Sequence, residues 1–152
     1  MPQVFEHRSI IRTTPEQMMA FHEHPKAFQR LTPPPVFIQI HHKNMPSLKD
    51  GEVEFTMWMG PVPVRWMARH EPGPIETSFI DRQIKGPLKS WEHQHIFRPT
   101  EEGVELIDRI TLEHPSGWRG ILTRLVFGKI PLRFLFFYRH WRTRLGTQRK
   151  TK

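Results

Sequence analysis

The sequence predicts a single α+β domain in which a seven-stranded antiparallel sheet is covered by a long C-terminal helix. Three observations support this prediction. One strand and two short helices come first, six alternating segments with turn signals follow over residues 36–113, and a stretch with helical spacing comes last. Because 152 residues are enough for one domain with its own core, we take residues 1–152 as one unit.

The first segments are a strand and two short helices. In residues 4–12, one side of the expected strand carries Phe5, Ser9 and Ile11 and the other carries Glu6 and Arg8, as expected of a strand with one buried face. Thr14, Pro15 and Gln17 then supply the N-cap, the first helical residue and the capping-box partner of a helix. A second short helix is expected before the TPPP sequence at residues 32–35, which must end it because proline cannot continue a helix.

After the TPPP sequence, the chain reads as six strands joined by short connections, which implies an antiparallel meander. The turn signals are KDG, GPVP, PGP, KGP and TEEG, in that order. Residues that pair across a hairpin share one face of the sheet, so the turn positions assign side chains to faces. Asp81 then lies opposite His93 on one side and opposite Trp66 on the other. His95 lies opposite Asp108.

One face of the predicted sheet is apolar and the other is charged, as expected of a sheet that packs on a core. The apolar face collects Val53, Phe55, Met57, Val64, Trp66, Ala68, Phe79, Trp91, Phe97, Leu106, Ile110 and Leu112. Five polar residues share this face: Asp81, Gln83, His93, His95 and Asp108. Buried polar groups need partners, so these residues either bond to one another or line a cavity that holds water or a ligand.

The C-terminal segment has helical spacing over about residues 118–145. Gly128 and Pro131 interrupt it, and Pro131 is expected to kink the helix or divide it in two. The apolar residues form one stripe of Trp118, Leu122 and Leu125 and another of Phe134, Phe137, Tyr138, Trp141 and Leu145. We expect about half of these aromatic residues to cover the sheet.

Positive charge is concentrated at the end of the chain. The formal net charge is +8, and ten of the 23 Lys and Arg residues lie after Glu113, where no Asp or Glu remains. Residues 146–152 form a basic tail. The segment suits an anionic membrane surface, since aromatic residues lie between its arginines, and it suits nucleic acid less well. A basic helix packed over acidic neighbours is the alternative.

The chain contains no cysteine, which excludes disulfides and thiolate chemistry and fits a reducing cytoplasm. Its first residues, MPQVFEHRSII, have no apolar run of the signal-peptide kind, and no stretch approaches the roughly 20 apolar residues of a membrane span. We therefore expect a cytoplasmic protein that can contact a membrane peripherally through its basic C-terminal helix.

The segments FIDRQIKGPLKSWEHQHIF and LIDRITLEHP, together with the region up to TPPP, resemble the SRPBCC or START-like superfamily. The resemblance covers almost the whole chain and is strongest to the cyclase/dehydrase-like and coenzyme-Q-binding-protein-like branch. It implies the helix-grip fold, a seven-stranded antiparallel sheet curved around a long C-terminal helix and enclosing an apolar cavity. Members include polyketide aromatase/cyclases and lipid and quinone carriers, so the resemblance does not choose between a carrier and an enzyme.

Two interpretations of the polar residues on the apolar face concern structure and binding. In the first, they are hydrogen-bonded groups that fix the strand register beneath the helix. In the second, Asp81, Gln83, His93, His95 and Asp108 orient a carbonyl or hydroxyl of a hydrophobic ligand. The apolar wall of that site would be Phe55, Met57, Trp66, Phe79 and Trp91. The expected function is binding or transport of a lipid, quinone or polyketide-like molecule, with the oligomeric state left open.

Two further interpretations concern chemistry. In a cyclase or dehydratase, His95 with Asp108, or His93 with Asp81, would remove a proton next to a ketone. The two histidines and two carboxylates would also suffice to bind a metal, but alternate positions on a strand are not a zinc signature. We therefore expect no metal and no cofactor.

Overall fold

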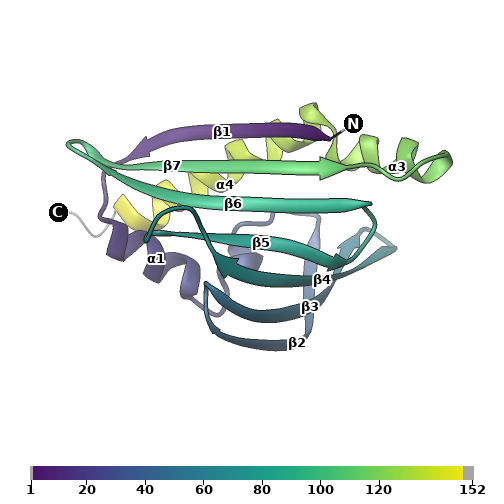
Figure 1. The fold of residues 1–152 in the computed structure, drawn as a ribbon, viewed down its shortest axis with the longest axis horizontal. Coiled ribbons are helices and arrows are strands. Elements are labelled where there is room, and N and C mark those ends of the chain that lie inside the picture. Colours follow the sequence, from purple (N-terminus) through teal and green to yellow (C-terminus); the bar gives the residue numbers. More distant parts are fainter. Residues whose placement is uncertain (1, 149–152) are drawn as a thin grey trace.

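The computed structural model describes residues 2–148 and contains the seven-stranded antiparallel sheet and the C-terminal helices that the sequence predicts (Figure 1). Residues 149–152, the end of the predicted basic tail, lie outside the described residues. The strands are β1 (Gln3–Ile11), β2 (Phe37–Ser47), β3 (Asp50–Met59), β4 (Val62–Pro72), β5 (Ser78–Lys85), β6 (Ser90–Thr100) and β7 (Gly103–Glu113). The helices are α1 (Pro15–Glu23), α2 (Ala27–Arg30), α3 (Trp118–Phe127) and α4 (Lys129–Gln148).

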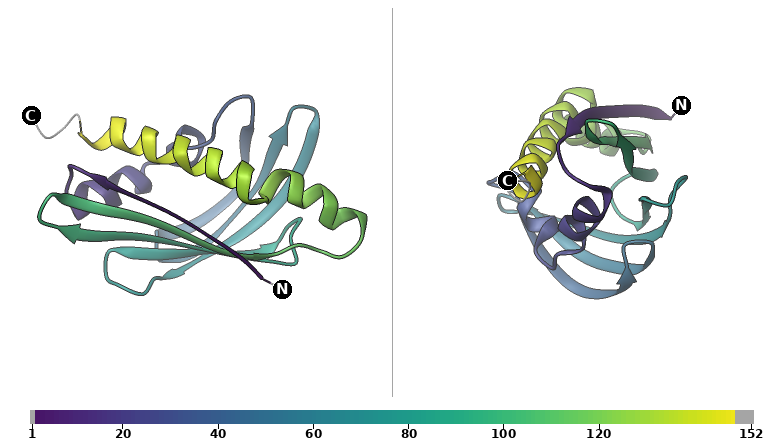
Figure 2. Two further views of the ribbon diagram at one scale, coloured as in Figure 1. Left: turned by 90° about the horizontal axis from the view of Figure 1, so that it is seen from above. Right: turned by 90° about the vertical axis from the view of Figure 1, so that its left-hand side faces the viewer.

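The sheet has the order β1-β7-β6-β5-β4-β3-β2, so the predicted meander runs from β2 to β7 and β1 joins at the far edge. It curls around α4, which lies across its concave side with α1 and α2 close by (Figure 2). The sheet is therefore open and curved, with a convex outer face and a concave inner face covered by helices, and a site can form on the concave face.

The first helix begins where the sequence predicts. Thr14 is the N-cap, and its hydroxyl accepts a hydrogen bond from the backbone N–H of Gln17 at 3.2 Å. The side chain of Gln17 does not complete a capping box with Thr14; it accepts a hydrogen bond from the hydroxyl of Thr13 at 2.8 Å instead. Thr14 therefore caps the helix, while Thr13 holds the side chain of Gln17.

Most of the predicted strand register is confirmed. Asp81 pairs with His93, and His95 pairs with Asp108. The pairing between β4 and β5 differs, since Asp81 lies opposite His70 and not opposite Trp66. The PGP sequence is not a tight turn, because the connection extends from Gly73 to residue 77 before β5 begins. The register moves by an even number of residues, so every side chain keeps its predicted face.

The C-terminal segment divides at Gly128 and not at Pro131. Pro131 lies in the first turn of α4, where a missing N–H costs no intrahelical hydrogen bond. The backbone N–H of Gly128 still bonds the carbonyl of Arg124 at 3.0 Å, and a Cβ at Gly128 would lie 2.4 Å from that oxygen. The chain changes direction at a residue that needs the room of glycine.

The two apolar stripes of the C-terminal helices lie mostly on their outer side. In the predicted stripes, Trp118, Leu122, Leu125, Phe134, Phe137, Trp141 and Leu145 are all exposed. The residues that α4 buries are Leu132, Phe136, His140, Thr143 and Thr147. The helix is apolar on more than one side, and the side that packs inward is the one whose smaller residues allow close approach and whose His140 reaches a buried carboxylate.

The core beneath the helices has two parts. The larger contains Ile38, Val53, Phe55, Trp66, Ala68, Leu88, Trp91, Ile110, Leu112, Phe127, Leu132 and Phe136. The smaller lies next to α1 and contains Ile11, Met18, Leu48, Phe79, Phe97, Val104 and Leu106. Between these parts, the polar residues of β5, β6 and β7 occupy the centre of the concave face.

Candidate functional site

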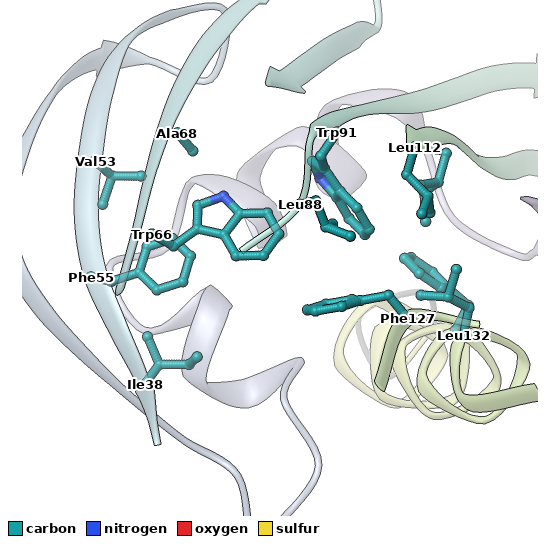
Figure 3. Close-up of a cluster of buried hydrophobic side chains, with 12 residues drawn as sticks. Ile38, Val53, Phe55, Trp66, Ala68, Leu88, Trp91, Leu112, Phe127 and Leu132 are labelled. Carbon is teal, nitrogen blue, oxygen red and sulfur yellow. The ribbon is translucent and has the colours of Figure 1, made fainter. Parts of the chain in front are cut away.

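A cavity of about 530 Å³ opens between the concave face of the sheet, α2 and the first half of α4. Its lining includes Phe55, Met57, Trp66, Phe79 and Trp91, all of which the sequence places on the apolar face. Figure 3 shows Trp66, Trp91 and Phe127 converging from the sheet and from the end of α3. The rings of Trp66 and Trp91 meet edge to face at 5.5 Å. This end of the cavity is aromatic and dry in character.

Polar side chains gather at the other end of the cavity. His93 and His95 reach it from β6, Asp81 from β5 and Arg139 from α4. The histidines are adjacent because alternate residues of a strand share a face, and their rings stack at 3.6 Å. His22 of α1 also lines the cavity. Four separate elements thus supply the polar end.

Asp108 lies behind the histidines and is the centre of their hydrogen bonds. One carboxylate oxygen accepts from His93 Nε2 at 2.7 Å, and the other accepts from His140 Nε2 at 2.6 Å. His95 Nδ1 lies 3.4 Å from the first oxygen. The side chain of Asp108 is buried and is not among the residues that line the cavity.

The two predicted His/Asp pairs are confirmed as strand neighbours, but their side chains form different hydrogen bonds. The strand pairing places Asp81 beside His93 and Asp108 beside His95, as predicted. The hydrogen bond, however, runs diagonally from His93 to Asp108, which is within reach of a long side chain across a sheet. Asp81 is left with a buried oxygen that has no partner.

His140 was missed in the sequence, although it completes the network. Its Nδ1 lies 2.5 Å from the hydroxyl of Ser9, so hydrogen bonds connect β1, α4, β7 and β6 through Ser9, His140, Asp108 and His93. The sequence could have indicated its inward position, because residues 132, 136, 140, 143 and 147 have helical spacing and form the buried side of α4.

The charge states follow from these contacts. Burial alone would raise the pKa of Asp108, but the hydrogen bonds from His140 and His93 outweigh it and hold the pKa well below its ordinary value. Burial lowers the pKa of His95 well below its ordinary value, and the neighbouring His93 lowers it further. At neutral pH, Asp108 is ionised and His95 is a neutral ring.

Three buried side-chain atoms have no hydrogen-bond partner within residues 2–148: Asp81 Oδ1, His95 Nε2 and Arg139 Nε. All three residues line the same cavity. A buried polar group without a partner is costly, so these three groups mark a place where water or a ligand could form hydrogen bonds. Asp81 offers an acceptor, Arg139 offers a donor, and the ring of His95 can act as either.

Comparison with known proteins gives a match in structure. No protein-family model and no curated protein matches the chain. The Zhui aromatase/cyclase from Streptomyces sp. R1128 has a TM-score of 0.74 at 10% identity, with 100% of this chain and 97% of that chain covered. Major latex-like protein 151 from Panax ginseng has a TM-score of 0.69 at 10% identity, with 97% and 98% covered. The chain has the helix-grip fold.

The same helix-grip unit matches part of a larger protein. A nucleoside-diphosphate sugar epimerase from Corynebacterium glutamicum has a TM-score of 0.65 at 23% identity, with 92% of this chain and 28% of that chain covered. All these identities are low, so the likeness is one of fold. The cyclase/dehydrase-like and coenzyme-Q-binding-protein-like branch stays a prediction.

Within this helix-grip cavity, three residues could hold a metal ion. Asp81, His93 and His95 each offer one ligand atom, and these atoms all lie within 4.8 Å of one another. The rings of His93 and His95, however, are stacked with 29° between their planes, so their in-plane lone pairs run side by side and converge poorly on one ion. The geometry suits a ligand that hydrogen-bonds to the ring edges better than a tetrahedral metal centre.

Gln83 does not line the helix-grip cavity, contrary to its placement among the ligand-contacting residues. Its side-chain amide donates to the carbonyl of Leu88 at 2.8 Å and accepts from the N–H of Leu88 at 3.2 Å. The residue therefore holds the connection between β5 and β6. Arg139 and His22 take up positions in the lining that the sequence did not predict.

Proposed function

We propose that the protein binds a small hydrophobic molecule with one polar group in the cavity between the sheet and α4. The observation that carries this proposal is that three polar atoms without partners, on Asp81, His95 and Arg139, lie together in a mostly apolar cavity. A volume of about 530 Å³ lies within the range of small-molecule sites, which are mostly apolar with a few placed polar groups.

The polar end restricts the chemistry of the ligand. Arg139 can only donate and the Asp81 carboxylate accepts, so a matching group has both an acceptor and a donor. A hydroxyl, or a hydroxyl beside a carbonyl, meets both demands, whereas a hydrocarbon meets neither. The apolar part of the ligand would lie against Trp66 and Trp91. Phenolic, quinol-like and polyketide-like molecules therefore fit better than plain fatty chains, and an aromatase/cyclase is among the proteins of this fold.

The test is extraction of the purified full-length protein with organic solvent, together with native mass spectrometry. We expect a copurifying apolar molecule that is lost on denaturation and rebinds when it is added back. Asp81→Asn and Arg139→Gln should each weaken rebinding about tenfold, since each replaces a charged hydrogen-bond partner of the ligand with a neutral one. Arg69→Gln, on the outer face of β4, is the matched control and should bind normally. Protein that yields no molecule and binds no phenolic compound would overturn the proposal.

Catalysis of the cyclase or dehydratase kind is the second candidate. His95 supports it, because its Nε2 is buried without a partner in the cavity wall while Asp108 lies beside its other nitrogen. Against it, the pKa of His95 is held well below its ordinary value, which makes the ring a weak base. Binding is therefore the better supported function.

His95→Asn separates the two candidates. If His95 is a general base, turnover of a polyketide-like substrate should fall at least about 100-fold while the dissociation constant changes little. His93→Asn, which breaks the bond to Asp108, is the companion variant. Unchanged turnover in both variants would remove these residues from any mechanism.

A further inference from the structure

The outer side of α3 and α4 is lined with large apolar side chains in contact with solvent. We call this set the outer stripe; it consists of Trp118, Ile121, Leu122, Leu125, Ile130, Phe134, Phe137, Trp141 and Leu145. Within residues 2–148, these are nine of the fourteen exposed large hydrophobic residues. Their exposed fractions run from 38% at Leu145 to 83% at Ile130. Scattered exposed apolar residues are ordinary, but a concentration of this size marks an interaction surface.

The spacing of the outer stripe places it on one side of each helix. In α3 its members lie at i, i+3, i+4 and i+7, and in α4 they recur every three or four residues. The opposite side of α4 is already engaged with the sheet through Leu132 and Phe136. Helix α4 is therefore apolar on two sides, one turned to the core and one turned outward.

The segment that carries the outer stripe contains basic residues but no acidic residues. Residues 114–148 contain seven Lys and Arg residues and no Asp or Glu. Arg139 enters the cavity and Arg144 bonds the carbonyl of Ile10. The remaining five make no ion pair with any residue of the described chain: Arg119, Arg124, Lys129, Arg133 and Arg142. Their charges are free to meet an anionic surface.

The outer stripe also meets the mouth of the cavity. Phe134 belongs to the stripe, with 66% of its surface exposed, and it lines the cavity as well. Pro131 and Leu135, on either side of it, line the cavity too. A surface that covered the stripe would therefore lie against the opening through which an apolar molecule passes.

We propose that the outer stripe docks on the surface of a membrane that contains anionic lipids. Its apolar side chains would enter the boundary between headgroups and acyl chains, while the cations beside them contact lipid phosphates. Within residues 2–148, no helix is long and apolar enough to cross a membrane, so α3 and α4 lie along the surface. The docking does not depend on the ligand proposed above, although it would bring the cavity mouth to the place where apolar molecules dissolve.

Two other occupants fit the outer stripe less well. In a symmetric pair of chains, the stripe would meet its own copy, and the cations of residues 114–148 would face like charges with no acid between them. An RNA would satisfy the cations but would leave aliphatic side chains such as Leu125 and Ile130 in water. A lipid surface satisfies both kinds of residue at once.

Vesicle sedimentation with the full-length protein tests the docking. We expect binding to phosphatidylcholine vesicles containing about 30% phosphatidylserine, little binding to phosphatidylcholine alone, and weaker binding as salt rises from about 0.1 to 0.5 M. Fluorescence of Trp118 and Trp141 should shift to the blue on binding, since both leave water. The double variant Ile130→Glu/Phe137→Glu should lose binding at least about tenfold.

The control variant adds the same two negative charges at positions outside the outer stripe. Val4→Glu/Val62→Glu alters two exposed valines outside the outer stripe and should bind with no more than the modest loss that added negative charge brings. Asp81→Asn changes the proposed ligand site but not the outer stripe, so this variant should bind vesicles as the wild-type protein does. The membrane proposal can therefore hold even if the ligand proposal fails. Equal losses in the two glutamate variants, no binding to anionic vesicles, or a dimer that only the stripe variant dissociates would overturn it.

Discussion

At the scale of single residues, the site depends on how one buried carboxylate is shared. Asp108 accepts hydrogen bonds from His93 and His140, and its negative charge is kept by these contacts despite complete burial. This leaves His95 without a strong bond to any residue of the described chain, and its outer nitrogen faces the cavity. The carboxylate thereby decides which histidine is structural and which is available to a ligand.

Asp108→Asn should destabilise the fold. Asparagine has one acceptor oxygen where aspartate has two, so one of the two histidine N–H groups loses its buried acceptor, which costs about 2 kcal/mol or more. Urea unfolding at neutral pH measures the loss. Asp50→Asn, at the exposed first residue of β3, is the control and should change the unfolding free energy by less than about 0.5 kcal/mol. A similar small change in both variants would contradict the central place given to Asp108.

Acid should destabilise the protein in two windows. Burial lowers the pKa of His22 from 6.5 to about 4. Below pH 6.5 the unfolded chain therefore binds a proton at His22 that the folded chain does not bind until about pH 4, and this favours unfolding. Between pH 7 and pH 5 this alone removes about 2 kcal/mol of stability. The pKa of Asp108 is lowered from 3.8, so its contribution is present above pH 3.8 and is lost as the pH falls further.

His22→Gln tests the first window. The variant lacks the titrating ring, so its loss of unfolding free energy between pH 7 and pH 5 should be smaller than that of the unchanged protein by about 2 kcal/mol. Urea titrations at the two pH values give the difference. His24→Gln, on an exposed neighbour, is the control. If both variants kept the original pH dependence, the acid sensitivity would have to arise elsewhere.

At the scale of elements, the strands could be predicted from the sequence in more detail than the helices. Alternating residues and turn signals fix the face of every strand, and only the connection after Pro72 was placed wrongly, because PGP resembles a tight turn and the loop is longer. In α4, two sides of the helix are apolar, so periodicity alone cannot say which side packs inward. Contacts distant in sequence decide it, such as the bond from His140 to Asp108.

Neighbouring phenylalanines of α4 test this assignment. Phe136 is 1% exposed and Phe137 is 67% exposed. Phe136→Ala should lower the unfolding free energy by about 3 to 5 kcal/mol, whereas Phe137→Ala should change it by less than about 0.5 kcal/mol. Denaturant unfolding of the two variants gives the comparison directly. Equal effects would mean that the helix is rotated from the orientation described above.

At the scale of the whole molecule, a helix-grip protein keeps an internal space that its own side chains do not fill. Polar residues from β5, β6 and α4 meet there only after the sheet has curled, so the sequence could supply the candidates on the strands but not Arg139 or His22. Their positions depend on how the helices cross the concave face. The polar end of the cavity is thus a property of the assembled fold.

Filling the cavity from the sheet should separate binding from folding. Ala68 is buried and lines the cavity, so Ala68→Leu would occupy space that a ligand needs. We expect less copurified ligand and no loss of unfolding free energy in the ligand-free protein, because added methyl groups fill an apolar space. Ala20→Leu, at an exposed position of α1, is the control. Full ligand occupancy in Ala68→Leu would place the ligand elsewhere.

The hydrogen bonds of His140 also restrict how the cavity can open. Lifting α4 would break the bonds to Ser9 and Asp108 and expose a buried charge, so the helix is fastened to the sheet. The opposite rim is made of the four-residue helix α2 and the chain at residues 33–36, and within residues 2–148 no network of side-chain hydrogen bonds like that of His140 holds either of them. A molecule that exchanged with the cavity would therefore pass this rim by a local displacement, while α4 stayed fixed on the sheet.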